Sequence, residues 1–299
     1  MRTIAMIKTP TREKLTLKGK LIRRKLRRIR KQINPYEPSL KNSPIIFANS
    51  FPKSGTHLLI QIMKGFSIIG PAVDSGLPAI TTFDGYIGRQ KSEEEIITEL
   101  KRLLPGDIAY GHLHADPEIS DLLCQKYFFT VFIIRDPRDV AVSHVHYLTN
   151  MEKKHIHHDY YQNTLHTFDD RLETSISGIS SNSRNNKMPN IYERFLPYLG
   201  WLDLPQISTI QYEELIAQQE EILKKILNQV LQKGFQINTS QDNALRILSE
   251  CINPESSPTF RSGKIGSWIS SFNDHNKDIF KEISGDLLIR LGYEENTNW

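Results

Sequence analysis

Short apolar runs alternate with amphipathic stretches along most of the chain. IIFANS (45–50) and KYFFTVFIIRDP (126–137) hold nearly continuous apolar residues, as in strands that are buried on both faces of a sheet. Each run is followed by a stretch with apolar residues at helical intervals, 57–69 and 137–148. This alternation predicts an α/β fold, a single domain with a central parallel sheet of about five strands flanked by helices.

The remaining elements are predicted from weaker patterns. Further strands are expected at 107–114 and 206–212. Helices are expected at 92–106, 213–232 and 273–293, the first with a serine cap and early acidic residues. The stretches 71–90, 150–190 and 252–268 are polar or rich in glycine, lack a clear period, and are expected to contain loops over a site.

Size and composition are those of a globular protein. Of 299 residues, 38% are hydrophobic and 24% charged, which is ordinary for a soluble domain. No apolar run reaches the length of about 18 residues that spans a bilayer, and the N-terminus lacks the apolar region of a secretory signal. Cys124 and Cys251 have no CxxC partner and are expected to be reduced thiols. The sequence therefore predicts a cytoplasmic protein.

The net charge of +4 is concentrated near the N-terminus, in residues 14–32. Without this segment the rest of the chain is slightly acidic. Its leucines and isoleucines partly follow helical spacing, which predicts a basic amphipathic helix that could bind anionic lipid, nucleic acid or acidic polysaccharide. The favoured interpretation is a solvated arm or one docked on its own domain. We expect at most weak membrane-surface contact through 14–32, and no specific nucleic acid partner.

A proline-bearing linker follows the basic segment, so residues 1–43 are taken as arm and linker.

The segment FPKSGTHLL (51–59) lies between the first predicted strand and its helix. Gly55 permits a sharp turn, so that successive N–H groups point at an anion near a helix N-terminus. Lys53 adds a positive charge, and Ser54 and Thr56 add hydroxyl donors. The lysine precedes the glycine, unlike GxxxxGK[ST], and no Mg²⁺ carboxylate is evident. A phosphate-binding loop that needs no metal suits a sulfuryl donor better than ATP.

Two further segments carry anion-binding residues. Arg135 ends the strongest predicted strand and Ser143 lies eight residues on, in the next helix. Ligands collect at the carboxyl ends of parallel strands, where the planar fork of an arginine suits a phosphate. A surface network of Arg135 with Asp136, Arg138 and Asp139 is the alternative interpretation. TFRSGKIGSW (259–268) could wrap a phosphate with backbone amides and cations, or form an ordinary exposed turn.

In order, spacing and context, the three segments resemble the PAPS-dependent sulfotransferases, close to the cytosolic type. The resemblance covers residues 44 to about 292, and 44–299 is taken as the sulfotransferase domain. It implies a P-loop-like fold and a transferase that moves a sulfuryl group from 3′-phosphoadenosine 5′-phosphosulfate (PAPS) to a hydroxyl or amine. The product nucleotide is adenosine 3′,5′-bisphosphate (PAP), and no metal takes part.

The resemblance also implies roles for individual residues. Lys53 stabilises charge on the leaving phosphate, and a histidine at a strand end, His112, is the general base, with His114 as the alternative. Tyr212 lies beside the adenine. The other donor contacts are Ser54, Gly55, Thr56 and His57 for the phosphosulfate and Arg135, Ser143, Arg261, Ser262 and Gly263 for the 3′-phosphate. The chain departs from the family pattern at Leu58, where a tryptophan is common, and at Tyr110, where a lysine is common.

Two other functions stay open at this level. A P-loop nucleotide kinase would require Mg²⁺ and ATP, and a non-catalytic binding protein would be tethered by the basic arm. The histidines at 144, 146, 155, 157 and 158 could bind zinc but lack a cysteine or carboxylate at regular spacing, so a polar rim of the acceptor site is favoured.

The acceptor is not specified by the sequence. The polar and histidine-rich content of 71–90 and 145–190 indicates a glycan or peptide, whereas Phe83, Tyr86 and Tyr147 suit a small phenol. The oligomeric state is open as well.

Overall fold

A computed structural model describes residues 16–33, 38–180, 187–256 and 263–299. At its centre is a parallel sheet in the order β2–β6–β1–β7–β8, with β3 also beside β6. The strands are β1 (Ile45–Ser50), β2 (Val73–Asp74), β3 (Ile80–Thr81), β6 (Asp107–His112), β7 (Phe128–Ile134) and β8 (Ser208–Gln211). Every residue of β1 and β7 is buried, as the continuous apolar runs predicted. The predicted parallel sheet is confirmed; β2 and β3 are two-residue strands that periodicity does not reveal.

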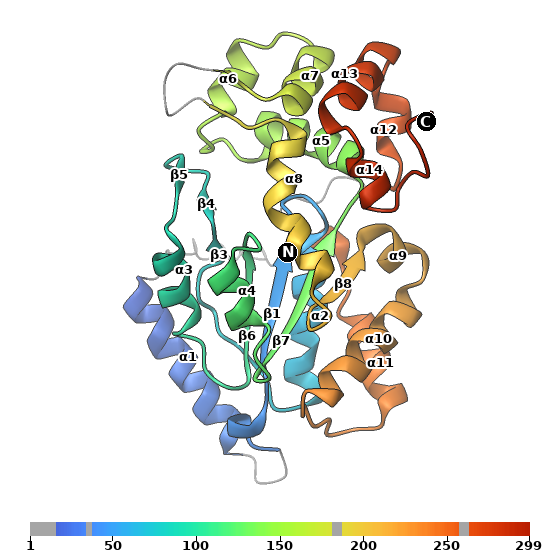
Figure 1. Ribbon diagram of the computed structural model, residues 1–299. Helices are drawn as coiled ribbons and strands as arrows, with labels where there is room; N and C mark the ends of the chain where they lie inside the picture. The colour runs from blue at the N-terminus through green and yellow to red at the C-terminus, as the bar shows by residue number, and fades with distance from the viewer. Residues whose placement is uncertain (1–15, 34–37, 181–186, 257–262) are drawn as a thin grey trace, which may run out of the picture.

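Helices cover both faces of this sheet (Figure 1). Alternate residues of β1 face different cores: Phe47 packs in one, and Ile46 and Ala48 pack in the other. The core around Ile46 is closed by α2 (Thr56–Ile69), α9 (Tyr212–Ala217), α10 (Gln219–Gln232) and α11 (Gln241–Glu250). The core around Phe47 is closed by α3 (Glu93–Leu100), α4 (Pro117–Leu123), α5 (Pro137–His146), α6 (His158–Asn163), α7 (Phe168–Ser177), α8 (Ile191–Leu199), α13 (Asp274–Ser284) and α14 (Leu287–Arg290).

Several expected elements differ in detail. The helix expected at 213–232 is divided into α9 and α10 at Gln218, which leaves helical geometry. The closing helix is divided at Gly285, which has a positive φ of 54°. The stretch 150–190, expected to contain loops, holds α6 and α7 as well. Helix α7 begins with a reciprocal cap between Thr167 and Asp170, a signal that its polar composition obscured.

Short elements complete the chain. The stretch 71–90 contains, besides β2 and β3, an antiparallel hairpin of β4 (Phe83–Asp84) and β5 (Arg89–Gln90). The others are α12 (Ser267–Ser271), the 3₁₀ turns η1 (Leu40–Asn42), η3 (Gly200–Asp203) and η4 (Pro254–Ser256), and a π-helical turn η2 (Tyr147–Met151). In the part of the chain that the structure describes, no helix has the length and apolar character needed to cross a membrane.

The basic segment forms helix α1 (Leu17–Gln32), which docks beside the β2–β6 edge of the sheet (Figure 1). Its basic side faces the protein. Arg24 and Arg28 each form an ion pair with the fully buried carboxylate of Asp107, the Arg28 contact being 2.8 Å long. Arg27 donates to the carbonyl of Ser75 at 2.9 Å. Helix α1, the described part of the basic segment, is therefore docked on its own domain, one of the two forms of the favoured interpretation.

The buried position of Asp107 leads to a first prediction. Removing one partner of a buried ion pair leaves an uncompensated charge, so Asp107→Asn should lower the free energy of unfolding by about 3 kcal/mol. Amide exchange along α1 should accelerate. The matched control is Asp203→Asn, because Asp203 pairs with Arg290 at 3.8 Å on the surface and should contribute no more than about 1 kcal/mol. Equal effects of the two substitutions in urea denaturation would contradict the docking described here.

Candidate active site

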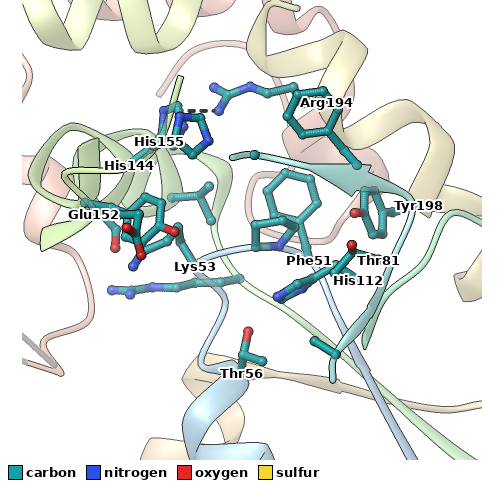
Figure 2. A pocket seen from close by; sticks show the side chains of 18 of the residues that line it. Phe51, Lys53, Thr56, Thr81, His112, His144, Glu152, His155, Arg194 and Tyr198 are labelled. Atoms are coloured by element: carbon teal, nitrogen blue, oxygen red, sulfur yellow. Dashed lines mark hydrogen bonds between the residues drawn. The ribbon is translucent and has the colours of Figure 1, made fainter. Parts of the chain in front are cut away.

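A cavity of about 1610 Å³ opens at the carboxyl ends of the central strands. Residues expected from the sequence to bind the donor or act in catalysis line it: Lys53, Gly55, Thr56, His57, His112, Arg135, Ser143, Tyr212 and Gly263. Ser54 is fully buried in the loop that borders the cavity, and His114 also lines the wall. Arg261 and Ser262 lie outside the described residues. The three predicted segments thus meet around one cavity. Figure 2 shows Lys53 and Thr56 of the first segment in the same cavity as His112.

The loop between β1 and α2 is built to receive an anion. Lys53 and Gly55 have positive φ angles of 72° and 91°, which turn the chain sharply into α2. Helix α2 has no side-chain cap, so its first N–H groups and the positive end of its dipole are available at the cavity. The Ser54 hydroxyl is buried without a hydrogen-bond partner. An orphaned buried hydroxyl beside an uncapped helix N-terminus fits a bound phosphate or phosphosulfate.

Tyr212 connects all three segments. Its ring fills the space beside Gly55, where a Cβ atom would lie 2.5 Å from Cδ2 of Tyr212. Its hydroxyl donates to the carbonyl of Gly263 at 3.0 Å, and the Arg135 guanidinium stacks 4.5 Å from its centre. The loop between β1 and α2, the end of β7 and the C-terminal loop therefore all contact the side chain of Tyr212.

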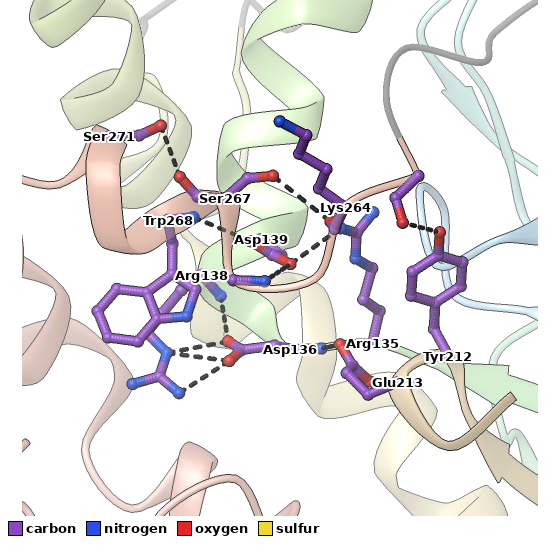
Figure 3. Close-up of polar contacts among 12 residues, drawn as sticks. Arg135, Asp136, Arg138, Asp139, Tyr212, Glu213, Lys264, Ser267, Trp268 and Ser271 are labelled. Carbon is purple, nitrogen blue, oxygen red and sulfur yellow. Dashed lines mark hydrogen bonds and ion pairs between the residues drawn. The ribbon is translucent and has the colours of Figure 1, made fainter. Parts of the chain in front are cut away.

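A buried ion network holds the C-terminal loop against α5 (Figure 3). Arg135 donates to Asp139 at 2.9 Å and to the carbonyl of Lys264 at 2.7 Å. Asp139 also accepts the N–H groups of Gly266 and Trp268, at 2.9 and 3.0 Å. The arginine–aspartate network considered as an alternative is thus present, but it is buried and coexists with a place for Arg135 in the cavity wall. The positioning role of Asp139 was not predicted, although an acid one turn after Arg135 was a usable signal.

His112 is tied to the end of β1. Its Nδ1 lies 2.8 Å from the carbonyl oxygen of Ser50. A carbonyl only accepts, so Nδ1 carries the proton and Nε2 of the neutral ring is an acceptor. Burial lowers the pKa of His112, the Ser50 hydrogen bond raises it, and the charges of His57 and Lys53 lower it further. The net shift is downward, which favours the neutral imidazole.

Ser50 was not among the predicted site residues. Its hydroxyl lies 2.8 Å from Oγ1 of Thr56 and 3.1 Å from Nδ1 of His112, and so connects the histidine with the first residue of α2. Its place as the polar last residue of an apolar strand was the available signal. His114 differs: its ring packs edge-on against Tyr198 at 4.9 Å, and burial lowers its pKa to about 4.

Comparison with known proteins adds to this geometry. The sequence profile described as "Sulfotransferase domain" matches residues 44–292, most of the chain. The chain belongs to the sulfotransferase family. No curated protein sequence gave a significant match.

Solved structures show the same fold as this sulfotransferase. Mouse sulfotransferase SULT7A1 complexed with PAP aligns with a TM-score of 0.56 at 20% identity, over 84% of this chain and 88% of that one. Retinol dehydratase in complex with androsterone and inactive cofactor PAP aligns with a TM-score of 0.57 at 17% identity, over 83% of each chain. Retinol dehydratase in a complex with retinol and PAP aligns with a TM-score of 0.53 at 16% identity, over 83% of each chain.

The wall of the sulfotransferase cavity opposite the loop is formed by the β4–β5 hairpin and the segment after α5. The Tyr86 hydroxyl donates to Glu152 at 3.2 Å, and the Ile156 N–H donates to the Gly85 carbonyl at 3.1 Å. Lys53 extends from the loop to Tyr147, with Nζ 4.2 Å from the ring centre. Phe83, Tyr86 and Tyr147, expected near the acceptor, all line this cavity.

The histidine-rich segment contributes to the same wall. His144, His155 and His157 line the cavity together with Arg194, a residue that the sequence did not single out. Within the described ranges, no three histidine, cysteine, aspartate or glutamate side chains are arranged to hold a metal ion.

The contact between Gly55 and Tyr212 leads to a second prediction. Gly55→Ala places a Cβ atom at a positive φ and against the Tyr212 ring. Backbone strain alone costs roughly 1–3 kcal/mol, and the clash adds to it, so the free energy of unfolding should fall by more than this amount. Gly234→Ala is the matched control, because Gly234 has a φ of 88° and open space around its missing Cβ. Denaturant titration measures the difference between the two variants. Equal losses would show that Tyr212 does not require a glycine here.

Proposed function

We propose that this sulfotransferase transfers a sulfuryl group from PAPS to a hydroxyl or amine of an acceptor bound in the cavity. The observation that carries the proposal is the convergence of the three anion-binding segments on Tyr212, beside a histidine whose Nε2 is free to accept a proton. PAP in the similar solved structures supports the choice of donor. The cytoplasmic location remains a prediction.

The residues present fit the donor. The orphaned Ser54 hydroxyl and the N–H groups at the start of α2 would hold the phosphosulfate, with Lys53, Gly55, Thr56 and His57 around it. Arg135 and Ser143 would hold the 3′-phosphate, joined by Gly263 and by Arg261 and Ser262 of the same loop. Tyr212, between Gly55 and Arg135, would lie beside the adenine.

The chain's own residues then supply the chemistry. Nε2 of His112 accepts the proton of the acceptor hydroxyl as the new oxygen–sulfur bond forms. Lys53 and the N–H groups at the start of α2 stabilise the negative charge that remains on the leaving oxygen. The bound donor supplies the sulfuryl group and a phosphate that departs with the electron pair of the broken sulfur–oxygen bond. Neutral His112 becomes imidazolium, and its Nδ1–H bond to Ser50 keeps the ring oriented.

His112 is preferred to His114 as the base because of its partners. Through Ser50 it is connected to Thr56 of the phosphate-binding loop, which links the base to the donor site. The His114 ring packs against Tyr198 instead.

Calorimetric titration with PAP in the absence of Mg²⁺ tests the donor site. Micromolar binding is expected, weakened roughly 10- to 100-fold by Arg135→Ala, because a hydrogen bond to a charged group contributes about 1.5–3 kcal/mol. Arg246→Ala is the control, since Arg246 is exposed and pairs only within α11. Absence of PAP binding together with binding of ATP–Mg²⁺ would replace this proposal with a nucleotide kinase.

Substitution of the base gives a separate prediction. His112→Asn should reduce turnover with a panel of neutral and anionic phenols by about 10²- to 10⁴-fold while PAP binding persists. His114→Asn is the matched control and should retain most activity. If only His114→Asn abolished turnover, the assignment would pass to His114.

The pH profile follows from the same residue. The base acts in its neutral form, so kcat/KM should be constant above the pKa of His112 and fall as the pH drops through it. Burial places that pKa below the ordinary 6.5, so the acid limb should lie below pH 6.5. An acid limb well above that pH would contradict the burial of His112.

A further inference from the structure

The end of the cavity remote from the phosphate-binding loop is cationic. Arg194 of α8 and His144 of α5 lie there, with His155 beside them, while Thr56 and His112 lie at the opposite end (Figure 2). Phe51 and Tyr198 separate the two ends with aromatic surface, their rings 5.0 Å apart.

The partners of Arg194 are uncharged. Its guanidinium donates to the carbonyl of Ser175 and, at 3.3 Å, to Nδ1 of His144. Among the described residues, no carboxylate lies within ion-pair distance of it, and its buried Nε has no hydrogen-bond partner. Burial lowers its pKa only to about 10, so it stays charged at neutral pH. A partly buried charge without a counterion is costly, and this one borders a cavity.

The neighbouring histidines are neutral. Nδ1 of His144 lies 3.3 Å from the Arg194 guanidinium and 3.0 Å from the Ser175 hydroxyl, which hold the ring beside Arg194. The His157 N–H donates at 3.2 Å to Nδ1 of His155, which leaves the proton of His155 on Nε2. Burial lowers the pKa of both rings, that of His155 to about 4, and keeps them neutral. One fixed positive charge with the N–H donor of His155, beside the neutral ring of His144, is a set of groups suited to an anion.

The cavity is lined by four carboxylates, Asp84, Asp116, Glu152 and Glu193, and none of them forms an ion pair with Arg194 in the part of the chain that the structure describes. Glu152 accepts from the Tyr86 hydroxyl, and Glu193 accepts from the Asn190 N–H at the start of α8. The counterion of Arg194 is therefore missing from the protein's own described side chains.

We propose that Arg194, His144 and His155 bind an anionic group of the acceptor, so that the acceptor is a hydroxyl compound with an apolar or aromatic body and an acidic group at its far end. A carboxylate, a sulfate ester or a phosphate ester would satisfy this chemistry. The proposal rests on the proposed function, because the acceptor hydroxyl must reach His112.

Matched phenols test the proposal. The probes are 4-hydroxyphenylacetate and 3-(4-hydroxyphenyl)propanoate, each compared with its neutral amide. The wild-type chain should use the carboxylates with at least tenfold higher kcat/KM. Arg194→Gln should raise KM for the carboxylates at least tenfold, leave the amides and PAP binding unchanged, and be partly rescued by Arg194→Lys. Arg171→Gln is the control, because Arg171 donates to the carbonyls of Tyr161 and Leu165 and is not part of the cavity wall.

Three results would overturn the proposal. The wild-type chain could show equal kcat/KM for amides and carboxylates, or Arg194→Gln could lower kcat/KM equally for both kinds of phenol. The third is that protein which binds PAP turns over neither carboxylate. Failure of the wild-type chain to bind PAP would instead refute the proposed donor site, so the two failures are distinguishable.

An independent observation concerns the outer face of α1. Ile22, Leu26, Ile29 and Ile33 follow the spacing i, i+4, i+7, i+11 and are 45–72% exposed. This apolar stripe lies opposite the basic residues that dock the helix, Arg24, Arg27 and Arg28. The usual orientation of an amphipathic helix on a globular domain is therefore reversed.

Exposed basic residues border the apolar stripe. Lys18 and Lys25 lie on one side of it and Arg23 and Arg30 on the other, and α1 contains no acidic residue. An apolar stripe between rows of bases is the pattern of helices that lie in the interface of an anionic membrane. We infer that α1 docks the enzyme on a bilayer surface rich in anionic lipid.

Vesicle sedimentation tests this inference. The full chain should bind vesicles of 70% phosphatidylcholine and 30% phosphatidylserine at least tenfold more tightly than pure phosphatidylcholine, and Ile22→Ser with Ile29→Ser should abolish the difference. Ile68→Ser with Ile269→Ser is the control, since both residues are exposed elsewhere. No vesicle binding, or equal binding by the two double variants, would overturn it. A wild-type chain that forms a dimer in solution but binds no vesicles, with the dimer lost in the α1 double variant, would also overturn it. The apolar stripe would then contact a second copy of the chain.

Discussion

The site depends on the parallel register of β1 with its two neighbours. Asn49 pairs with Gly111 on one side, and Ser50 pairs with Ile133 on the other, so three strands end at the same level. The register places His112 against the carbonyl of Ser50, where a single hydrogen bond fixes the proton on Nδ1. A shift of one residue would turn the side chains of β1 to opposite faces and separate His112 from the loop between β1 and α2. Sheet packing therefore determines which nitrogen of His112 carries the proton.

The cavity walls are joined by a few shared groups. Tyr212 occupies the space that Gly55 leaves empty and holds Gly263, while Asp139 links Arg135 to the main chain of the C-terminal loop. At the far end, Arg194 keeps its charge among neutral partners. The cavity thus has an anion-binding region at the loop, an aromatic middle, and a second cationic region on α5 and α8. Under the proposed function, the region at the loop would hold the doubly phosphorylated donor, and the aromatic middle and second cationic region would orient the acceptor.

Much of this was predictable from local sequence. Apolar runs located β1 and β7, and glycine, lysine and arginine at strand ends located segments that line the cavity, because these residues act through the backbone geometry of their own segment. Ser50 and Arg194 were not predicted, and Asp139 was considered only in a surface network with Arg135, because their roles arise from contacts between segments distant in sequence. Arg194 is the clearest case: a basic residue on a polar helix face gave no sign that it would border a cavity without a counterion. Likewise, the inward orientation of the bases in α1 depends on Asp107, more than seventy residues away.

The ends of these strands are expected to bind a nucleotide at two separate phosphate positions without a metal. A crystal structure of the chain grown with PAP and Mg²⁺ would show both positions. We expect the 5′-phosphate against Ser54 and the first N–H groups of α2, the 3′-phosphate between Arg135 and Ser143, and no Mg²⁺ between nucleotide and protein. A nucleotide bound outside this cavity, or a phosphate held at the loop through Mg²⁺, would contradict this expectation.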